Sequence, residues 1–183
     1  MRIISGKARG TKLYSLEGST TRPTLDRVKE SLFNIIQNQV PECTFLDLFS
    51  GSGAIGLEAA SRGANKTILC EKNKAAISII KKNIEKTHLE DKVKLYENSY
   101  ENLLNTINEK FDIIYIDPPY KTDFAYEATN LILKNNLLNE KGTIIIETDE
   151  EERIIKQIEK LEIEIVNRRR YGRIHLVFLE KWD

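Results

Sequence analysis

Short apolar runs alternate along the chain with stretches in which apolar residues recur every three or four positions. The runs cover residues 45–49, 66–70, 93–96, 113–116 and 142–146. Apolar residues at helical spacing occupy the segments between these runs and the segment after the last one. Buried strands that alternate with amphipathic helices are typical of an α/β fold built on a parallel sheet.

The beginning of the chain carries a different pattern. Residues 1–14 contain short β-prone pieces around a glycine-bounded basic turn, which predicts a small hairpin. A helix is expected over residues 22–36, with Thr24 as its cap. Asn73 and Asp123 are placed to cap two later helices in the same way.

The end of the chain predicts antiparallel strands. Residues 163–166 and 174–179 are expected to pair with each other around the arginine-rich segment 168–173. No repeat, linker or low-complexity segment interrupts the 183 residues. The chain 1–183 therefore reads as one domain, in which a hairpin-and-helix extension (1–40) packs on the core (41–183).

Composition restricts the class of protein. Basic and acidic residues number 28 each, so the formal net charge is zero. This balance argues against a strongly basic coat that binds nucleic acid nonspecifically. The two cysteines, Cys43 and Cys70, form no Cys-x-x-Cys motif and no cluster with histidine. Neither a metal site nor a disulfide framework is expected.

Membrane and export signals are missing from the pattern. Residues 1–7 lack the apolar core of a signal peptide. No uninterrupted apolar segment approaches the roughly 18 residues of a membrane span. We expect a cytoplasmic protein that does not contact membranes and that is a monomer.

Residues 44–56 are the stretch around which the chain is organised. The apolar run 45–49 leads into a Ser-Gly-Ser-Gly turn at positions 50–53, and a helical pattern begins at Ala54. A strand, a glycine turn and a helix in this order form the crossover that binds nucleotide cofactors. Glycine is required where the backbone adopts conformations closed to other residues or approaches a ligand closely.

Glu71 stands at the end of the next apolar run, twenty positions after Gly51. In nucleotide-binding folds, an acidic residue at about this spacing accepts hydrogen bonds from both hydroxyls of a ribose. The alternative is an ordinary surface carboxylate at a strand end. The glycine turn upstream favours the ribose role.

A second motif, Asp117-Pro-Pro-Tyr120, follows the apolar run 113–116. If both runs belong to one parallel sheet, this motif and the glycine turn open at the same edge, where α/β sheets bind ligands. The Asp117 carboxylate and the Pro118 carbonyl can accept both N–H bonds of an exocyclic base amine, which turns the nitrogen lone pair toward an electrophile. The prolines pre-organise the loop, and Tyr120 offers a ring on which a flipped base stacks. The alternative reading is a rigid turn at a strand end.

The implied electrophile is a sulfonium methyl group, and two features favour S-adenosylmethionine over a nicotinamide cofactor. Asp47 would place negative charge beside a pyrophosphate, whereas S-adenosylmethionine carries a cationic amine and a sulfonium. The motif at 117–120 also has no obvious part in hydride transfer. The glycine pattern by itself is weak evidence, since dinucleotide-binding proteins share it.

Four segments resemble the RsmD-type 16S ribosomal RNA (guanine-N2) methyltransferases. They are residues 2–10, 22–34, 47–58 and 117–120, and the resemblance covers nearly the whole chain in matching order. It implies the Rossmann-like fold of class I S-adenosylmethionine-dependent methyltransferases, an α/β fold with a seven-stranded, mostly parallel sheet whose last strand is antiparallel. It also implies methylation of one guanine N2 amine in 16S ribosomal RNA, within the small subunit or its assembly intermediate.

Carried onto this sequence, the resemblance implies roles for individual residues. The glycine turn and Asp47 would hold the methionine part of the cofactor, Glu71 the ribose and Asn98 the adenine. Many relatives have an aspartate where Asn98 stands. The candidate cofactor-binding residues are Asp47, Phe49, Ser50, Gly51, Gly53, Glu71, Lys72, Asn98 and Ser99. The candidate catalytic residues are Asp117, Pro118, Pro119 and Tyr120.

Positive charge is concentrated at the beginning of the chain. Residues 1–29 contain seven basic side chains, Lys29 among them, against two acidic ones. A phosphate-contacting arm and a solvated sheet edge are both open readings of this excess. The candidate RNA-contacting residues are Arg2, Lys7, Arg9, Arg22, Arg27, Arg170 and Arg173.

Three other functions fit parts of the pattern. An adenine-N6 methyltransferase acting on DNA or RNA uses the same amine chemistry, although no separate DNA-reading domain is visible. An NAD-binding oxidoreductase shares the glycine turn, and the cofactor that raises the melting temperature distinguishes it. A non-catalytic RNA-binding module would bind RNA and transfer no methyl group.

Overall fold

The computed structural model describes residues 1–17 and 23–183, with side chains for 1–17 and 25–183. In this part of the chain, seven strands form one sheet in the order β3-β2-β1-β4-β5-β7-β6. The strands are β1 (Thr44–Asp47), β2 (Lys66–Cys70), β3 (Val93–Tyr96), β4 (Phe111–Ile116), β5 (Leu138–Thr148), β6 (Glu164–Tyr171) and β7 (Ile174–Glu180). β7 runs antiparallel to both neighbours, and all pairs among β1 to β5 are parallel. The predicted Rossmann-like sheet with an antiparallel last strand is confirmed.

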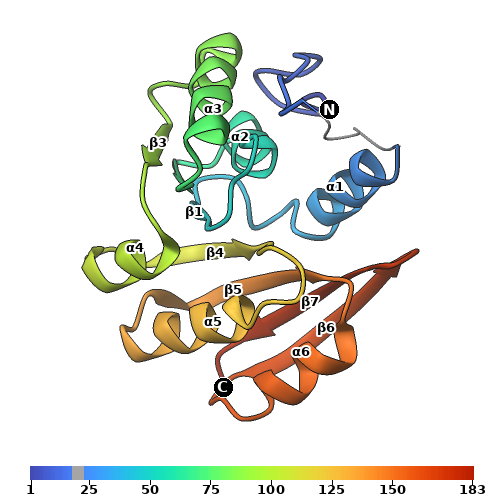
Figure 1. The fold of residues 1–183 in the computed structure, drawn as a ribbon, viewed down its shortest axis with the longest axis vertical. Coiled ribbons are helices and arrows are strands. Elements are labelled where there is room, and N and C mark those ends of the chain that lie inside the picture. Colours follow the sequence, from blue (N-terminus) through green and yellow to red (C-terminus); the bar gives the residue numbers. More distant parts are fainter. Residues whose placement is uncertain (18–22) are drawn as a thin grey trace.

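Helices cover both faces of this sheet (Figure 1). They are α1 (Pro23–Ile35), α2 (Ala54–Ser61), α3 (Lys74–Thr87), α4 (Tyr100–Thr106), α5 (Phe124–Lys134) and α6 (Glu151–Ile158). α4, α5 and α6 share one apolar core with the sheet, and α1 and α2 contribute to a second core on its other face. None of the helices in the described residues is long and apolar enough to cross a membrane.

The side chains of β1 alternate between the two faces of the sheet. Phe45 packs in the core below α1, and Leu46 packs in the core below α4, α5 and α6. Asp47, two positions after Phe45, therefore faces the α1 side. The register pairs Asp47 with Tyr115 of β4 and Tyr115 with Ile145 of β5, so side chains on this face stand in one row.

Three local expectations differ from the structure. α1 begins at Pro23, so Thr24 lies inside the helix instead of capping it. Proline suits the first turn of a helix, where its missing N–H group is not needed. Asp123 precedes α5, yet its side chain makes no cap and accepts hydrogen bonds from α6 instead. The arginines at 168–170 belong to β6, and the hairpin turn is made around Gly172, whose φ is +63°.

The N-terminal segment is a turn that packs on α2. The predicted hairpin consists of one antiparallel bridge, between Arg2 and Lys12. Ile3 is fully buried in the small core that this segment shares with α2. At Gly6, where φ is +88°, an added Cβ would lie 1.9 Å from the carbonyl oxygen of Ser61, so glycine alone permits this approach.

Glu58 of α2 is fully buried and binds the segment through its carboxylate. The amides of Ile4 and Ser5 donate to it at 2.9 and 3.0 Å, and Arg62 Nε donates at 2.8 Å. The Lys29 ammonium lies 3.2 Å from Glu58 Oε2, and Lys29 is only 1% exposed. Burial lowers the pKa of Lys29, while the charge of Glu58 opposes that shift. Lys29 is therefore a structural charge and does not belong to the solvent-exposed basic arm.

Asn83 of α3 joins the same segment to the glycine turn. Its Oδ1 accepts a hydrogen bond from the Tyr14 amide at 2.7 Å. Its Nδ2 donates to the Tyr14 carbonyl at 3.0 Å and to the Ser52 carbonyl at 2.9 Å. One buried amide thus connects three parts of the chain that are distant in sequence.

Replacing Glu58 by alanine should destabilise the protein by roughly 3–5 kcal/mol, because it leaves Lys29 buried without a counter-charge. Denaturant unfolding measures this loss, and hydrogen exchange at the Ile4 and Ser5 amides should accelerate more than in the central strands. Glu85→Ala, at an exposed position of α3, is the control and should stay within about 0.5 kcal/mol of the wild type. Equal losses in both variants would contradict the role assigned to Glu58.

Candidate functional site

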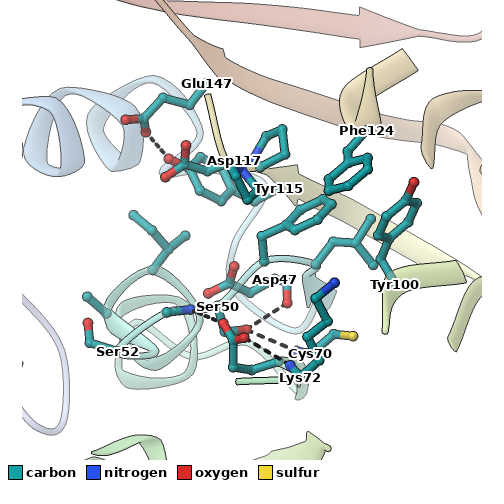
Figure 2. A pocket seen from close by; sticks show the side chains of 18 of the residues that line it. Asp47, Ser50, Ser52, Cys70, Lys72, Tyr100, Tyr115, Asp117, Phe124 and Glu147 are labelled. Carbon is teal, nitrogen blue, oxygen red and sulfur yellow. Dashed lines mark hydrogen bonds between the residues drawn. The ribbon is translucent and has the colours of Figure 1, made fainter. Parts of the chain in front are cut away.

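A cavity of about 530 Å³ opens at the carboxyl edge of the sheet, between the glycine turn and the loop after β4 (Figure 2). Its other walls come from α1, the end of β5, and the residues before and at the start of α4. The lining includes these predicted site residues: Asp47, Phe49, Ser50, Gly51, Glu71, Lys72, Asn98, Ser99, Asp117, Pro118, Pro119 and Tyr120. Gly53 is buried beneath the turn and lies outside the lining.

The glycine turn is held by one serine. Ser50 Oγ donates to the carbonyl of Asp47 at 2.8 Å and accepts from the amide of Cys70 at 3.1 Å, so it joins β1 to β2. Gly51 and Gly53 adopt φ values of +56° and +82°, which favour glycine. The turn thereby leads into α2 with its backbone against the cavity.

Asp47 places a buried carboxylate at the floor of the cavity. Its Oδ2 accepts a hydrogen bond from the Gly56 amide at 3.0 Å. Among the described residues, Oδ1 has no partner although it is buried. Burial, together with the charges of Glu71 and Glu147, raises the pKa of Asp47 to about 7. A buried acceptor without a donor suits a ligand that carries a positive charge or an N–H group.

Glu71 is fixed between the glycine turn and α3. Its Oε2 accepts from the Gly51 amide at 3.0 Å, and its Oε1 accepts from the amides of Lys72 and Asn73 at 2.9 Å each. Asn73 in turn caps α3 as predicted, because its side chain accepts from the Ala76 amide. Glu71 therefore lies in the cavity lining in one defined orientation.

Asn98 and Ser99 differ in what their side chains do. Asn98 Oδ1 accepts from the Ser99 amide at 2.8 Å, so Asn98 is held next to the cavity. Ser99 Oγ accepts from the Asn102 amide at 3.2 Å and caps α4. The Ser99 hydroxyl thus has a structural bond of its own beside the cavity.

An aromatic wall, formed by Phe49, Tyr100 and Phe124, lines the cavity. Figure 2 shows Tyr100 and Phe124 together on one side of it. The rings of Phe49 and Tyr100 lie 5.1 Å apart, and those of Phe49 and Phe124 lie 6.3 Å apart and parallel within 3°. Tyr100 and Phe124 were not predicted. Each begins a helix directly after a loop that lines the cavity, and this position in sequence is the signal that marks them.

Asp117 presents its carboxylate to the cavity without a protein donor. The residue is exposed to solvent in the cavity, and no described residue donates a hydrogen bond to it. The protein that surrounds it, with the charges of Glu147 and Asp47, raises the pKa of Asp117 well above its usual range. The Pro118 carbonyl likewise has no described donor, whereas the Pro119 carbonyl accepts from the Thr122 hydroxyl at 2.8 Å.

Glu147 and Tyr115 are site residues that sequence reasoning missed. Both line the cavity, and the Tyr115 hydroxyl donates to Glu147 Oε2 (Figure 2). Burial raises the pKa of Glu147, and the bond from Tyr115 opposes that shift. Glu147 directly follows the apolar run of β5, as Asp117 follows that of β4, and this repeated pattern could have identified it.

The predicted RNA-contacting residues that the structure describes lie outside the cavity lining. Six of them are exposed: Arg2, Lys7, Arg9, Arg27, Arg170 and Arg173. Arg22 lies outside the described residues. The β6–β7 hairpin that carries Arg170 and Arg173 extends beyond the rest of the sheet (Figure 1). In the described part of the chain, no three His, Cys, Asp or Glu side chains are grouped to hold a metal ion.

The amino-acid sequence matches one family model and is similar to proteins that carry names. The family model described as conserved hypothetical protein 95 matches residues 1–180. The protein named ribosomal RNA small subunit methyltransferase D from Haemophilus influenzae is 37% identical over 158 residues, which cover 85% of this chain and 82% of that protein. The protein of the same name from Escherichia coli (strain K12) is 34% identical over 151 residues, which cover 82% and 76%.

Solved structures share the fold along the whole chain. The structure of the yhhF protein of Escherichia coli has a TM-score of 0.83 at 26% identity and covers 100% of this chain and 99% of its own. A hypothetical protein of Thermus thermophilus has a TM-score of 0.81 at 30% identity, with coverage of 98% and 99%. The chain belongs to the conserved hypothetical protein 95 family, the RsmD family that its sequence resembles.

Proposed function

We propose that the protein transfers a methyl group from S-adenosylmethionine to the exocyclic N2 amine of one guanine in 16S ribosomal RNA. The observation that carries this proposal is a pair of carboxylates in one cavity, each short of a donor. Asp47 Oδ1 is buried without a partner, and Asp117 receives no hydrogen bond from the described residues. The names of the relatives, which refer to ribosomal RNA of the small subunit, support the class of substrate.

The residues present fit S-adenosylmethionine. The unpaired oxygen of Asp47 suits the cationic amine of the methionine part, and the fixed carboxylate of Glu71 suits a ribose. Asn98 and the aromatic wall form a partly apolar compartment that suits an adenine. When bound, the cofactor supplies a methyl carbon activated by a sulfonium.

Asp117 and the Pro118 carbonyl prepare the amine. Each accepts one N–H bond, so the nitrogen lone pair, otherwise delocalised into the base, is turned out of the ring plane. Asp117 also takes the proton that the nitrogen loses, directly or through water, and its raised pKa favours this step. Tyr120 is 67% exposed at the mouth of the cavity and offers its ring to a flipped base.

The remaining predictions concern the partner and the chain as a whole. We propose that the substrate is 16S RNA in the small subunit or its assembly intermediate, and that the exposed arginines of the β6–β7 hairpin and the N-terminal segment contact its phosphates. The protein is proposed to act as a metal-free monomer in the cytoplasm, where ribosomal subunits are assembled. Residues 1–40 and 41–183 are proposed to form one domain.

Mapping labelled methyl groups tests the whole proposal. Small subunits from cells that lack the protein are incubated with the purified enzyme and labelled S-adenosylmethionine. Incorporation at N2 of a single guanine is expected. Label on an adenine N6 would support the alternative methyltransferase, and RNA binding without any label would support the non-catalytic alternative.

Replacing Asp117 by alanine should lower kcat/KM for methyl transfer by roughly a hundredfold to a thousandfold, the usual loss when one preorganised hydrogen-bonding group at the reacting atom is removed. Calorimetric affinity for the cofactor should change little. Asp91→Ala, at an exposed position before β3, is the matched control and should keep full activity. Full activity in Asp117→Ala would remove Asp117 from the mechanism.

Cofactor affinity should rise with pH up to about 7 and then level off. Asp47, whose pKa is raised to about 7, is mostly protonated below that value in the free protein, and a cationic ligand favours its charged form. The cofactor affinity increases by up to about tenfold per pH unit in the range where binding releases one proton. Asp47→Asn should weaken binding roughly tenfold to hundredfold near pH 8 and flatten the rise. Calorimetry between pH 5.5 and 8 measures both effects, and an unchanged slope in the variant would refute the assignment.

Reversing the hairpin charges should weaken RNA methylation and spare the cofactor site. The double variant Arg170→Glu/Arg173→Glu is expected to raise KM for the RNA substrate. The slope of log RNA affinity against log salt concentration should be shallower by roughly one for each RNA phosphate that the variant no longer neutralises. Lys141→Glu/Lys160→Glu carries the same charge change at two exposed positions near the amino ends of β5 and β6, away from the hairpin turn, and serves as control. Equal KM values in the two double variants would exclude the hairpin from the RNA interface.

A further inference from the structure

Glu147 stands beside Asp117 across the two central strands. The parallel register pairs Ile116 of β4 with Ile146 of β5, so the residue that follows each of them stands at the same level of the sheet edge. Figure 2 shows both carboxylates at the same side of the cavity. Burial and, after it, the charge of Glu147 raise the pKa of Asp117 well above its usual range. Asp117 and Glu147 therefore form an acidic pair at this edge of the sheet.

Tyr115 holds Glu147 in one orientation. The tyrosine is 1% exposed, and its hydroxyl donates to Glu147 Oε2. Among the described residues, no donor bonds to the second oxygen, Oε1, and Glu147 remains partly accessible from the cavity. A buried phenol that fixes one carboxylate oxygen leaves the other as a rigid acceptor, which suits recognition of a ligand group.

Among the described residues, no neighbouring cation satisfies this pair. Lys29 also lines the cavity, yet its ammonium donates to the Arg2 carbonyl at 2.5 Å and lies 3.2 Å from Glu58. Two adjacent carboxylates with free acceptor positions suit a ligand edge that carries several N–H groups side by side.

We propose that Glu147 reads the N1–H group of the target guanine, while Asp117 holds the neighbouring N2 amine. This inference rests on the proposed function. Guanine presents N1–H and the N2 amine on adjacent ring positions, which matches two acceptors on adjacent strands. Adenine presents a lone pair at N1, which a carboxylate repels. Glu147 is then the residue that selects guanine, and Tyr115 is a positioning residue that acts through it.

The test uses 2-aminopurine, a base that keeps the methyl-accepting amine and lacks the N1 hydrogen. Small-subunit RNA is joined from synthetic pieces so that the mapped target is either guanine or 2-aminopurine, and each RNA is assembled into particles. The wild type should prefer guanine in kcat/KM by roughly tenfold to a hundredfold or more, the range for one hydrogen bond to a charged group. Glu147→Gln has an amide that can donate to an unprotonated N1, so the preference should shrink by at least about tenfold.

Three further variants separate recognition from general damage. Tyr115→Phe, which frees Glu147 to rotate, should reduce the guanine preference by a smaller factor and serves as the second variant if Glu147→Gln does not fold. Asp117→Ala should slow both substrates by similar factors and keep their ratio. Glu140→Gln removes an exposed charge at the other end of β5 and should match the wild type.

The outcomes distinguish this inference from the proposed function. If the wild type places no methyl group on a guanine N2, the proposed function itself fails. If it methylates guanine and 2-aminopurine equally well, or if Glu147→Gln and Tyr115→Phe both keep the wild-type preference, Glu147 does not read N1. Cofactor affinity, measured by calorimetry for every variant, shows that each protein is folded and loaded.

Discussion

Three carboxylates are crowded at the carboxyl edge of the sheet, and the packing of the rest of the fold holds them there. Asp47, Asp117 and Glu147 stand at the ends of adjacent strands. Loss of water to the surrounding protein raises the pKa of all three, and neighbouring negative charge further raises the pKa of Asp47 and Asp117. Such a cluster opposes folding, because the like charges repel one another and the Asp47 carboxylate is buried with only one of its two oxygens hydrogen-bonded. It is maintained where ligands that supply donors and positive charge complete it, which is typical of functional sites.

The rest of the fold provides a rigid frame for this cluster. Two separate apolar cores hold the strands from both faces, and the glycine turn is tied to β2 through the Ser50 hydroxyl. Gly56 brings α2 against the strands, because an added Cβ would lie 2.0 Å from Leu69 Cδ2 and 3.3 Å from Asp47 Cβ. The amide of Gly56 is the donor that orients Asp47. Close packing and carboxylate geometry are thus two results of the same glycine.

The fold could be predicted from sequence because its elements are set by local patterns. The apolar run 66–70 coincides with β2, and Asn73 caps α3 where the pattern placed it. What local patterns could not show is which side chains meet across distant segments. Glu147 joins the site only through the pairing of β5 with β4, and Lys29 leaves the basic surface only because Glu58, on another helix, binds it. Both are consequences of tertiary packing, which charge counting along the chain does not include.

The anchoring of the N-terminal segment affects what binding requires of the protein. The buried side chains of Glu58 and Asn83 hold its backbone at Ile4, Ser5 and Tyr14 through hydrogen bonds. The ordering of this segment is therefore completed during folding, together with that of α2 and α3. A partner that docks on this segment meets a preformed surface, so the segment itself loses little conformational entropy on binding. Association can therefore be fast, and single charges can tune its strength.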